Sequence, residues 1–179
     1  RAFMAEAAAL SPLALIVEGT HPETQTPVSE GEVLARAAEA VSRAEGLVVA
    51  DFGPRNVERL LSFLAVARQT GRRLAVTLKD AYLLEALHAA GESNVPDPLA
   101  DEGLAVYVEA KATRQNWERA LLERYQGLCP ERLVTAGQVG RDQGGYILCF
   151  SYYDLHELID IQPDGGTYIY SSSEAYNEE

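Results

Sequence analysis

The feature that most constrains the fold of this chain is a series of uninterrupted apolar runs separated by helical segments. Residues 47–50, 104–108 and 146–150 are such runs, and none of them alternates apolar with polar residues. Strands of this kind are buried on both faces, and when helices connect them they form a parallel sheet covered on both sides. The sequence therefore predicts an α/β fold with a Rossmann-like parallel sheet and helices on both faces, built as a single domain over residues 1–179.

The start and stop signals of helices divide the rest of the chain. Ser29 and Glu32 form a capping box, Pro54 suits a first helical turn, Asp80 is a candidate cap and Gly71 is a stop signal. From these signals and the periodicity we expect helices over residues 1–10, 29–44, 54–70, 81–90, 117–125 and 151–160, and strands over residues 13–17, 47–50, 74–78, 104–108, 132–135, 146–150 and 166–170.

Composition narrows the classes of function. The net charge of −12 argues against a general polyanion binder, so any nucleic-acid site has to be local. No run is as long as a membrane span and the first residues lack the apolar core of a signal peptide, which predicts a cytoplasmic protein without a membrane partner. Cys129 and Cys149 stand alone, so they predict neither a disulfide framework nor a zinc site.

Polar residues follow four of the expected strands, at residues 18–21, 51–56, 151–154 and 171–174. The carboxyl ends of parallel strands meet at one edge of the sheet, where open α/β sheets bind their ligands. Small hydroxyl residues and glycine at a helix start leave backbone N–H groups for a phosphate. The alternative at each junction is that the polar residue only caps the next helix. The pattern leaves both interpretations open.

Several well-known motifs are absent from the sequence. There is no Gly-x-Gly-x-x-Gly, no Gly-x-x-x-x-Gly-Lys-[Ser/Thr] and no Gly-x-Ser-x-Gly, which argues against a nicotinamide enzyme, a P-loop NTPase and an α/β-hydrolase. The histidines His21, His88 and His156 are scattered, and nothing resembles His-x-His-x-Asp-His. The sequence therefore predicts no metal site within this chain.

Four stretches, taken together and in order, resemble a known family. They are ALIVEGT at residues 14–20, VADFGPRNVER at 49–59, GRRLAV at 71–76 and SSSEAYNE at 171–178. Their residues and order are similar to those of the β-CASP domain of metallo-β-lactamase-fold nucleases. That family includes ribonuclease J and the endonuclease that trims messenger RNA 3′ ends, and the resemblance covers nearly the whole chain.

The resemblance implies roles for seven residues. Glu18 matches the acidic residue that supports the active site by orienting a histidine. Six others match positions beside the nucleic-acid cleft: Asn56 and Arg59 at a helix start, Ser151 in a loop, and Ser171, Ser172 and Ser173 in the phosphate-contacting serine run. The family's His-x-His-x-Asp-His half is not in this sequence. The resemblance thus implies a piece of a longer protein whose metallo-β-lactamase domain supplies zinc. It implies RNA, with DNA as the alternative, as the substrate, and RNA or another single-stranded nucleic acid as the partner.

Three hypotheses follow for the function. The first is the substrate-clamping domain of a metal-dependent nuclease, with no metal, cofactor or activity of its own. The second is a non-catalytic Rossmann-like module that binds a nucleotide or nucleic acid, which fits the acidic composition. The third is a small-molecule hydrolase or transferase with Glu18 or Asp51 as its base, for which the sequence offers no nucleophile paired with a histidine.

Overall fold

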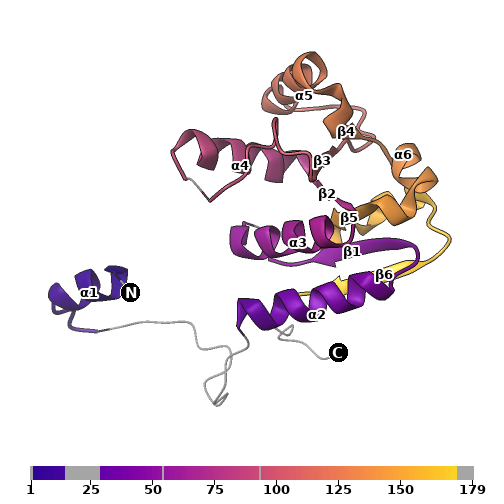
Figure 1. Cartoon of the computed structure of the whole chain (residues 1–179). Helices are drawn as coiled ribbons and strands as arrows, with labels where there is room; N and C mark the ends of the chain where they lie inside the picture. The colour runs from indigo at the N-terminus through magenta and orange to yellow at the C-terminus, as the bar shows by residue number, and fades with distance from the viewer. Residues whose placement is uncertain (1, 15–28, 54, 93, 173–179) are drawn as a thin grey trace.

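The protein folds around one parallel six-stranded sheet (Figure 1). The computed structural model describes residues 2–14, 29–53, 55–92 and 94–172. The strands are β1 Leu47–Asp51, β2 Arg73–Val76, β3 Leu104–Tyr107, β4 Leu133–Val134, β5 Tyr146–Cys149 and β6 Gly166–Tyr170, in the order β4-β3-β2-β5-β1-β6. Every pair of neighbours is parallel. The predicted Rossmann-like α/β class is confirmed.

Two apolar clusters, one on each face of the sheet, hold the helices to it. The first lies between the sheet and α2 Glu30–Arg43, α3 Val57–Gln69, α4 Leu78–Ala89 and α5 Asn116–Leu128. The second lies between the opposite face and α6 Ala136–Arg141, η3 Tyr152–Glu157 and α7 Leu158–Ile161. Residues of one strand divide between the clusters by alternation: Val48 and Ala50 point to the first face, Leu47 and Val49 to the second. The short elements α1 Ala2–Ala9, η1 Pro130–Arg132 and η2 Gln143–Gly145 complete the described structure.

Side-chain caps set where the helices begin. The predicted capping box at the start of α2 is present, with the Ser29 hydroxyl accepting from the Glu32 N–H at 3.2 Å and Glu32 accepting from the Ser29 N–H at 2.9 Å. At α4 the expected cap was wrong, because Thr77 is the cap and Asp80 is the third helical residue of the same box. At α3 the helix begins at Val57, after the N-cap Asn56.

The structure differs from the expectation at one predicted strand and at one helix that was not predicted. Of the strand expected over residues 13–17, only Leu13 and Ala14 are described, and neither belongs to a strand; the rest lies outside the described residues. The helix α6 was not expected, because its sequence AGQVGR carries two glycines and no apolar period. A capping box of Thr135 and Gln138 opens it, and Val139 is fully buried in the second apolar cluster.

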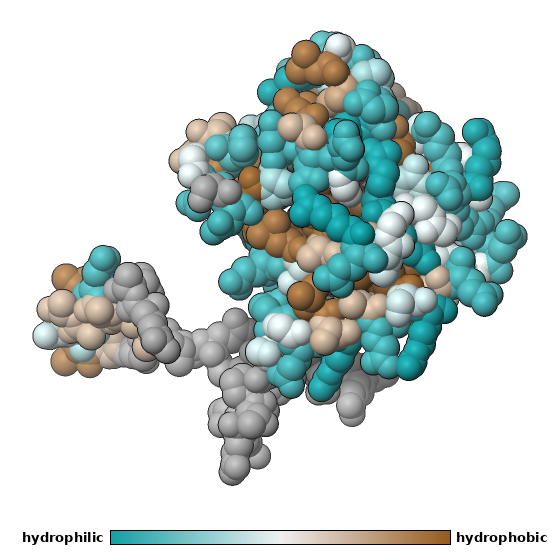
Figure 2. All heavy atoms as spheres, viewed as in Figure 1, coloured by the Kyte–Doolittle hydropathy of each residue, from teal (hydrophilic) through white to brown (hydrophobic). Residues whose placement is uncertain are grey.

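The surface seen in Figure 2 is mainly hydrophilic over the α/β body, with hydrophobic residues visible between the helices. Among the described residues, no helix combines the length and apolar character needed to cross a bilayer.

Candidate functional site

A cleft of about 870 Å³ opens at the carboxyl edge of the sheet. Residues that follow β1, β2, β5 and β6 line it. The topology explains its place, because β5 lies between β1 and β2 but is followed by η3 on the opposite face from α3 and α4. Connections that leave neighbouring strands toward opposite faces create a crevice, which is the usual ligand site of an open α/β sheet.

One end of the cleft lies at the loop between β1 and α3. Its backbone turns sharply, with the Asn56 N–H donating to the Gly53 carbonyl at 3.1 Å and Arg55 in a left-handed conformation at φ 67°. The Asn56 Oδ1 accepts from the Arg59 N–H at 3.1 Å and so caps α3. Ser172 borders the same loop, since a Cβ on Gly53 would lie 3.9 Å from its hydroxyl oxygen. This end carries an exposed arginine, an amide and a hydroxyl group.

The other end of the cleft is formed by two capping boxes on the neighbouring strands β2 and β5. Asp80 Oδ2 accepts from the Thr77 hydroxyl at 2.7 Å, and Asp154 Oδ2 accepts from the Ser151 hydroxyl at 2.6 Å. Burial raises the pKa of Asp80, and the nearby charge of Asp154 adds to this, against the lowering effect of the bonds from Thr77. Two carboxylates therefore lie within electrostatic reach of each other at this end.

Tyrosine rings border the acidic end. Tyr82 is 53% exposed, and Tyr152 and Tyr153 on η3 are 74% and 84% exposed. The rings of Tyr152 and Tyr153 meet edge to face with centroids 6.0 Å apart. The Tyr82 ring lies 5.4 Å from that of Trp117, on the neighbouring helix α5. The cleft therefore has an aromatic rim on the α4 and η3 sides.

The carboxylate of Asp51, the candidate base of the third hypothesis, is part of the sheet edge. Asp51 is 6% exposed at the end of β1 and accepts a hydrogen bond from the Tyr168 hydroxyl. Burial and this bond raise the pKa of Tyr168 to about 12. The Asp51 carbonyl also accepts from the Ser171 N–H at 2.7 Å, which fixes the chain as it leaves β6.

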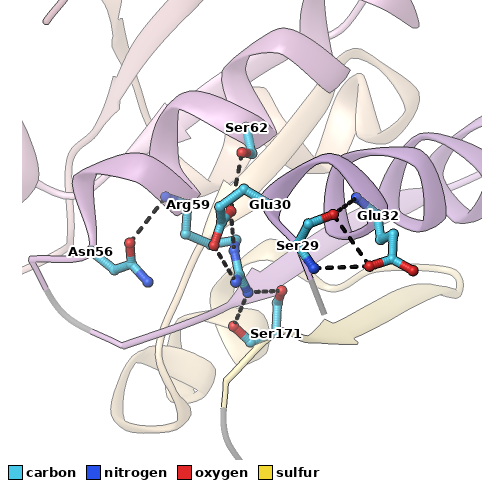
Figure 3. Close-up of polar contacts among 7 residues, drawn as sticks. All are labelled: Ser29, Glu30, Glu32, Asn56, Arg59, Ser62 and Ser171. Atoms are coloured by element: carbon cyan, nitrogen blue, oxygen red, sulfur yellow. Dashed lines mark hydrogen bonds and ion pairs between the residues drawn. The ribbon is translucent and has the colours of Figure 1, made fainter. Parts of the chain in front are cut away.

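Arg59 joins three elements beside the cleft (Figure 3). Its Nε and Nη2 donate to the two carboxylate oxygens of Glu30 on α2 at 3.1 and 2.8 Å, and its Nη1 donates to the Ser171 carbonyl at 2.6 Å and to the Ser171 hydroxyl. The hydrogen bond from Arg59 lowers the pKa of Glu30, against a smaller raising effect of burial. We call this set, Glu30, Arg59 and Ser171, the arginine clamp.

The predicted site residues divide into three groups. Asn56, Ser151 and Ser172 line the cleft together. Arg59 and Ser171 belong to the arginine clamp beside it, where the guanidinium binds its carboxylate, carbonyl and hydroxyl partners. Glu18 and Ser173 lie outside the described residues. Contacts of these residues with nucleic acid stay a prediction.

Sequence reasoning missed the contribution of α4 to this cleft. The expected strand over residues 74–78 included Thr77. In the structure β2 ends at Val76, and Thr77 is the N-cap of α4. The spacing Thr77-x-x-Asp80 is itself a capping-box signal and could have revealed the junction. Tyr152 and Tyr153 belonged to a predicted polar junction, but nothing in the sequence distinguished their exposed rings from buried ones.

No three His, Cys, Asp or Glu side chains come together as a potential metal site within the described parts of the chain. Comparisons with family models, with curated proteins and with solved structures found no match.

Proposed function

We propose that this chain is the substrate-clamping β-CASP domain of a metal-dependent nuclease that hydrolyses phosphodiester bonds in RNA, working in the cytoplasm. The observation that carries the proposal is the meeting of Asn56, Ser151 and Ser172 in one cleft. These residues come from three separate stretches of sequence, and the family resemblance assigned all three to one nucleic-acid site.

The chemistry of the β1–α3 end supports a phosphate contact there. The exposed Arg55 carries a positive charge, and Asn56 and Ser172 offer amide and hydroxyl donors in the same part of the cleft. The start of the helix α3 adds its favourable dipole for an anion. At α4 and η3, by contrast, the carboxylates of Asp80 and Asp154 accept hydrogen bonds from the N-cap residues Thr77 and Ser151. We therefore assign the phosphate backbone of the substrate to the α3 side of the cleft.

The zinc of the proposed parent enzyme would belong to its metallo-β-lactamase domain. The described residues offer no set of three metal-binding side chains, so no chemical step is assigned to them. The role of this chain is to bind and orient the strand, and Glu18 would support a metal-site histidine from the partner domain.

The test is binding of fluorescein-labelled single-stranded RNA, measured by anisotropy over a series of salt concentrations. We expect weak binding that falls with salt, because a protein of net charge −12 opposes the polyanion and only local contacts favour it. Arg55→Ala should reduce the slope of log K against log salt by about 0.7, the contribution of one phosphate contact on a single strand. The matched control is Arg141→Ala, which removes an exposed arginine from the opposite edge of the sheet.

The proposal fails if RNA does not bind, or if Arg141→Ala lowers the slope while Arg55→Ala leaves it unchanged. The second result would move the site to the amino edge.

A further inference from the structure

We propose that the aromatic end of the cleft holds one unstacked base of the strand, and that it favours cytosine or adenine over uracil. This inference rests on the proposed function and adds to it the recognition of one base of the bound strand. The base would lie against Tyr82, Tyr152 and Tyr153, while its phosphate lies toward Arg55 and Ser172.

The exposure of the tyrosines supports a stacking role. Four tyrosines line the cleft and each is more than half exposed: Tyr82, Tyr152 and Tyr153 at the acidic end, and Tyr170 at the end of β6. Large aromatic side chains gathered at one depression mark an interaction site more often than scattered exposed ones do. Bases stack on such rings whatever their sequence, because every base has a flat π face.

The distribution of charge gives the nucleotide its direction. Two carboxylates, Asp80 and Asp154, outnumber the single ammonium group of Lys79 at the aromatic end, whereas Arg55 lies at the α3 end. A phosphate is repelled by the two carboxylates, but an uncharged base is not. The base therefore enters the aromatic end and the phosphate stays at the α3 end.

The same carboxylates predict the preferred base. A carboxylate only accepts hydrogen bonds, and it pairs well with an exocyclic amino group such as N4 of cytosine. In both capping boxes the internal bonds go to Oδ2 of the aspartate. Cytosine and adenine present an amino group on their Watson–Crick edge, whereas uracil presents a carbonyl oxygen in its place.

The size of the cleft agrees with a single nucleotide rather than a duplex. Its volume of about 870 Å³ falls within the usual range for small-molecule sites, which is about 300 to 1,000 Å³. A base within a duplex is covered on both faces by its neighbours. Stacking on the tyrosines thus requires a single strand or a frayed end.

The experiment compares 179-residue chains that carry Tyr152→Ala, Tyr153→Ala or Ile159→Ala, each titrated with oligo(C), oligo(U) and an abasic oligomer of equal length, and with free cytidine. Ile159 is the control, because it is as exposed as Tyr152 and lies on α7 outside the cleft. We expect each tyrosine variant to weaken oligo(C) binding by about 5-fold or more, from a stacking contribution of about 1–3 kcal/mol per base. The control should bind like the parent chain, and the parent chain should bind oligo(C) more tightly than oligo(U).

The outcomes separate the two proposals. If oligo(C) and the abasic oligomer bind equally, and the tyrosine variants bind like the parent chain, the base site is wrong while the nucleic-acid clamp stands. If free cytidine binds the parent chain and binds the tyrosine variants more weakly, but no oligomer binds, the base site stands and the clamp is wrong. If nothing binds, both are wrong.

Discussion

At the scale of single residues, Arg59 shows how one side chain can fix the edge of a site without lining it. Its guanidinium is bound by Glu30 on α2 and by Ser171 after β6, and its side chain is only 13% exposed. Because Ser171 precedes Ser172, the arginine clamp sets the path by which the serine run reaches the cleft. We therefore assign Arg59 a positioning role as well as its predicted place near nucleic acid.

We predict that Glu30→Gln lowers the free energy of unfolding at pH 7 by about 1 kcal/mol, because a neutral amide replaces a charge-assisted, two-point contact that is partly exposed. The pKa of Glu30 is lowered in the folded protein, so its contribution is complete above about pH 4.5 and is lost as the pH falls through the lowered value. Urea unfolding between pH 3 and pH 7 should show a smaller acid-dependent loss in the variant than in the parent chain, because Glu32 and Glu118 also have lowered pKa values and remain in both.

The control for this prediction is Glu39→Gln. Glu39 and Arg43 form an ion pair in which both side chains are more than half exposed. Such pairs contribute about 0–1 kcal/mol, so the control should change stability less than Glu30→Gln does. Equal losses in both variants would show that the arginine clamp has no special weight.

Asp80 should behave in the opposite way with pH. Burial raises its pKa, so between about pH 3.8 and the raised value the folded protein holds a proton that the unfolded chain has lost. Stability should therefore fall as the pH rises through this window.

Asp80→Asn should remove that part of the pH dependence, and Asp154→Asn should lower the pKa of Asp80 by removing a repelling charge. NMR titration of the Asp80 carboxyl carbon measures the pKa of Asp80 in the parent chain and in Asp154→Asn. An equal pKa in the two proteins would contradict the proximity of the two carboxylates.

The sequence predicted single residues well where the pattern was local. Ser29 and Glu32 form the predicted capping box at the start of α2. The partners of Arg59 could not be predicted, because Glu30 and Ser171 are 29 and 112 residues away in the chain. Contacts of that kind depend on which helices pack side by side.

At the scale of elements, the buried strands were the most predictable part. The expected strands at residues 47–50 and 104–108 agree with β1 and β3 to within one residue. A continuous apolar run is buried on both faces, so it is expected in the interior of a parallel sheet. The helix α6 was missed although Thr135 and Gln138 form a capping box at its start. Its two glycines and lack of an apolar period hid that local signal, and its packing against α7 is a tertiary contact.

Glycine substitutions test that packing. A Cβ on Gly140 of α6 would lie 2.6 Å from the Ile161 carbonyl oxygen, whereas a Cβ on Gly127 of α5 would meet nothing within 4 Å. We predict that Gly140→Ala destabilises the protein by about 1–3 kcal/mol through overpacking. Gly127→Ala should stabilise it by about 0.5–1 kcal/mol through helix propensity. Chemical denaturation measures both, and equal effects of the two substitutions would contradict the close approach of α6 and α7.

At the scale of the whole molecule, the order of the strands creates the site. The chain forms β1, β2, β3 and β4 in turn, each farther toward one edge of the sheet, and leaves a gap between β1 and β2. β5 then fills this gap, and β6 pairs with the free side of β1. The sequence predicted a parallel sheet but not the position of β5 between β1 and β2. The residues of a buried strand do not indicate which strands it pairs with. This position of β5 brings Asp51, Arg55 and Asn56 to the same cleft as Ser151 and Asp154, although the two groups are far apart in sequence.

We propose that single-stranded RNA binds at the carboxyl edge of the sheet, and NMR chemical-shift mapping on the ¹⁵N-labelled chain can locate the bound strand. On titration with a short single-stranded RNA, we predict the largest amide shifts at Gly53, Arg55, Asn56, Ser151 and Ser172, which line the cleft. Amides at the opposite edge, among them Arg43, Gly140, Arg141 and Asp164, serve as the internal control and should not move. Shifts confined to that amino edge, or no shifts at saturating RNA, would contradict the claim.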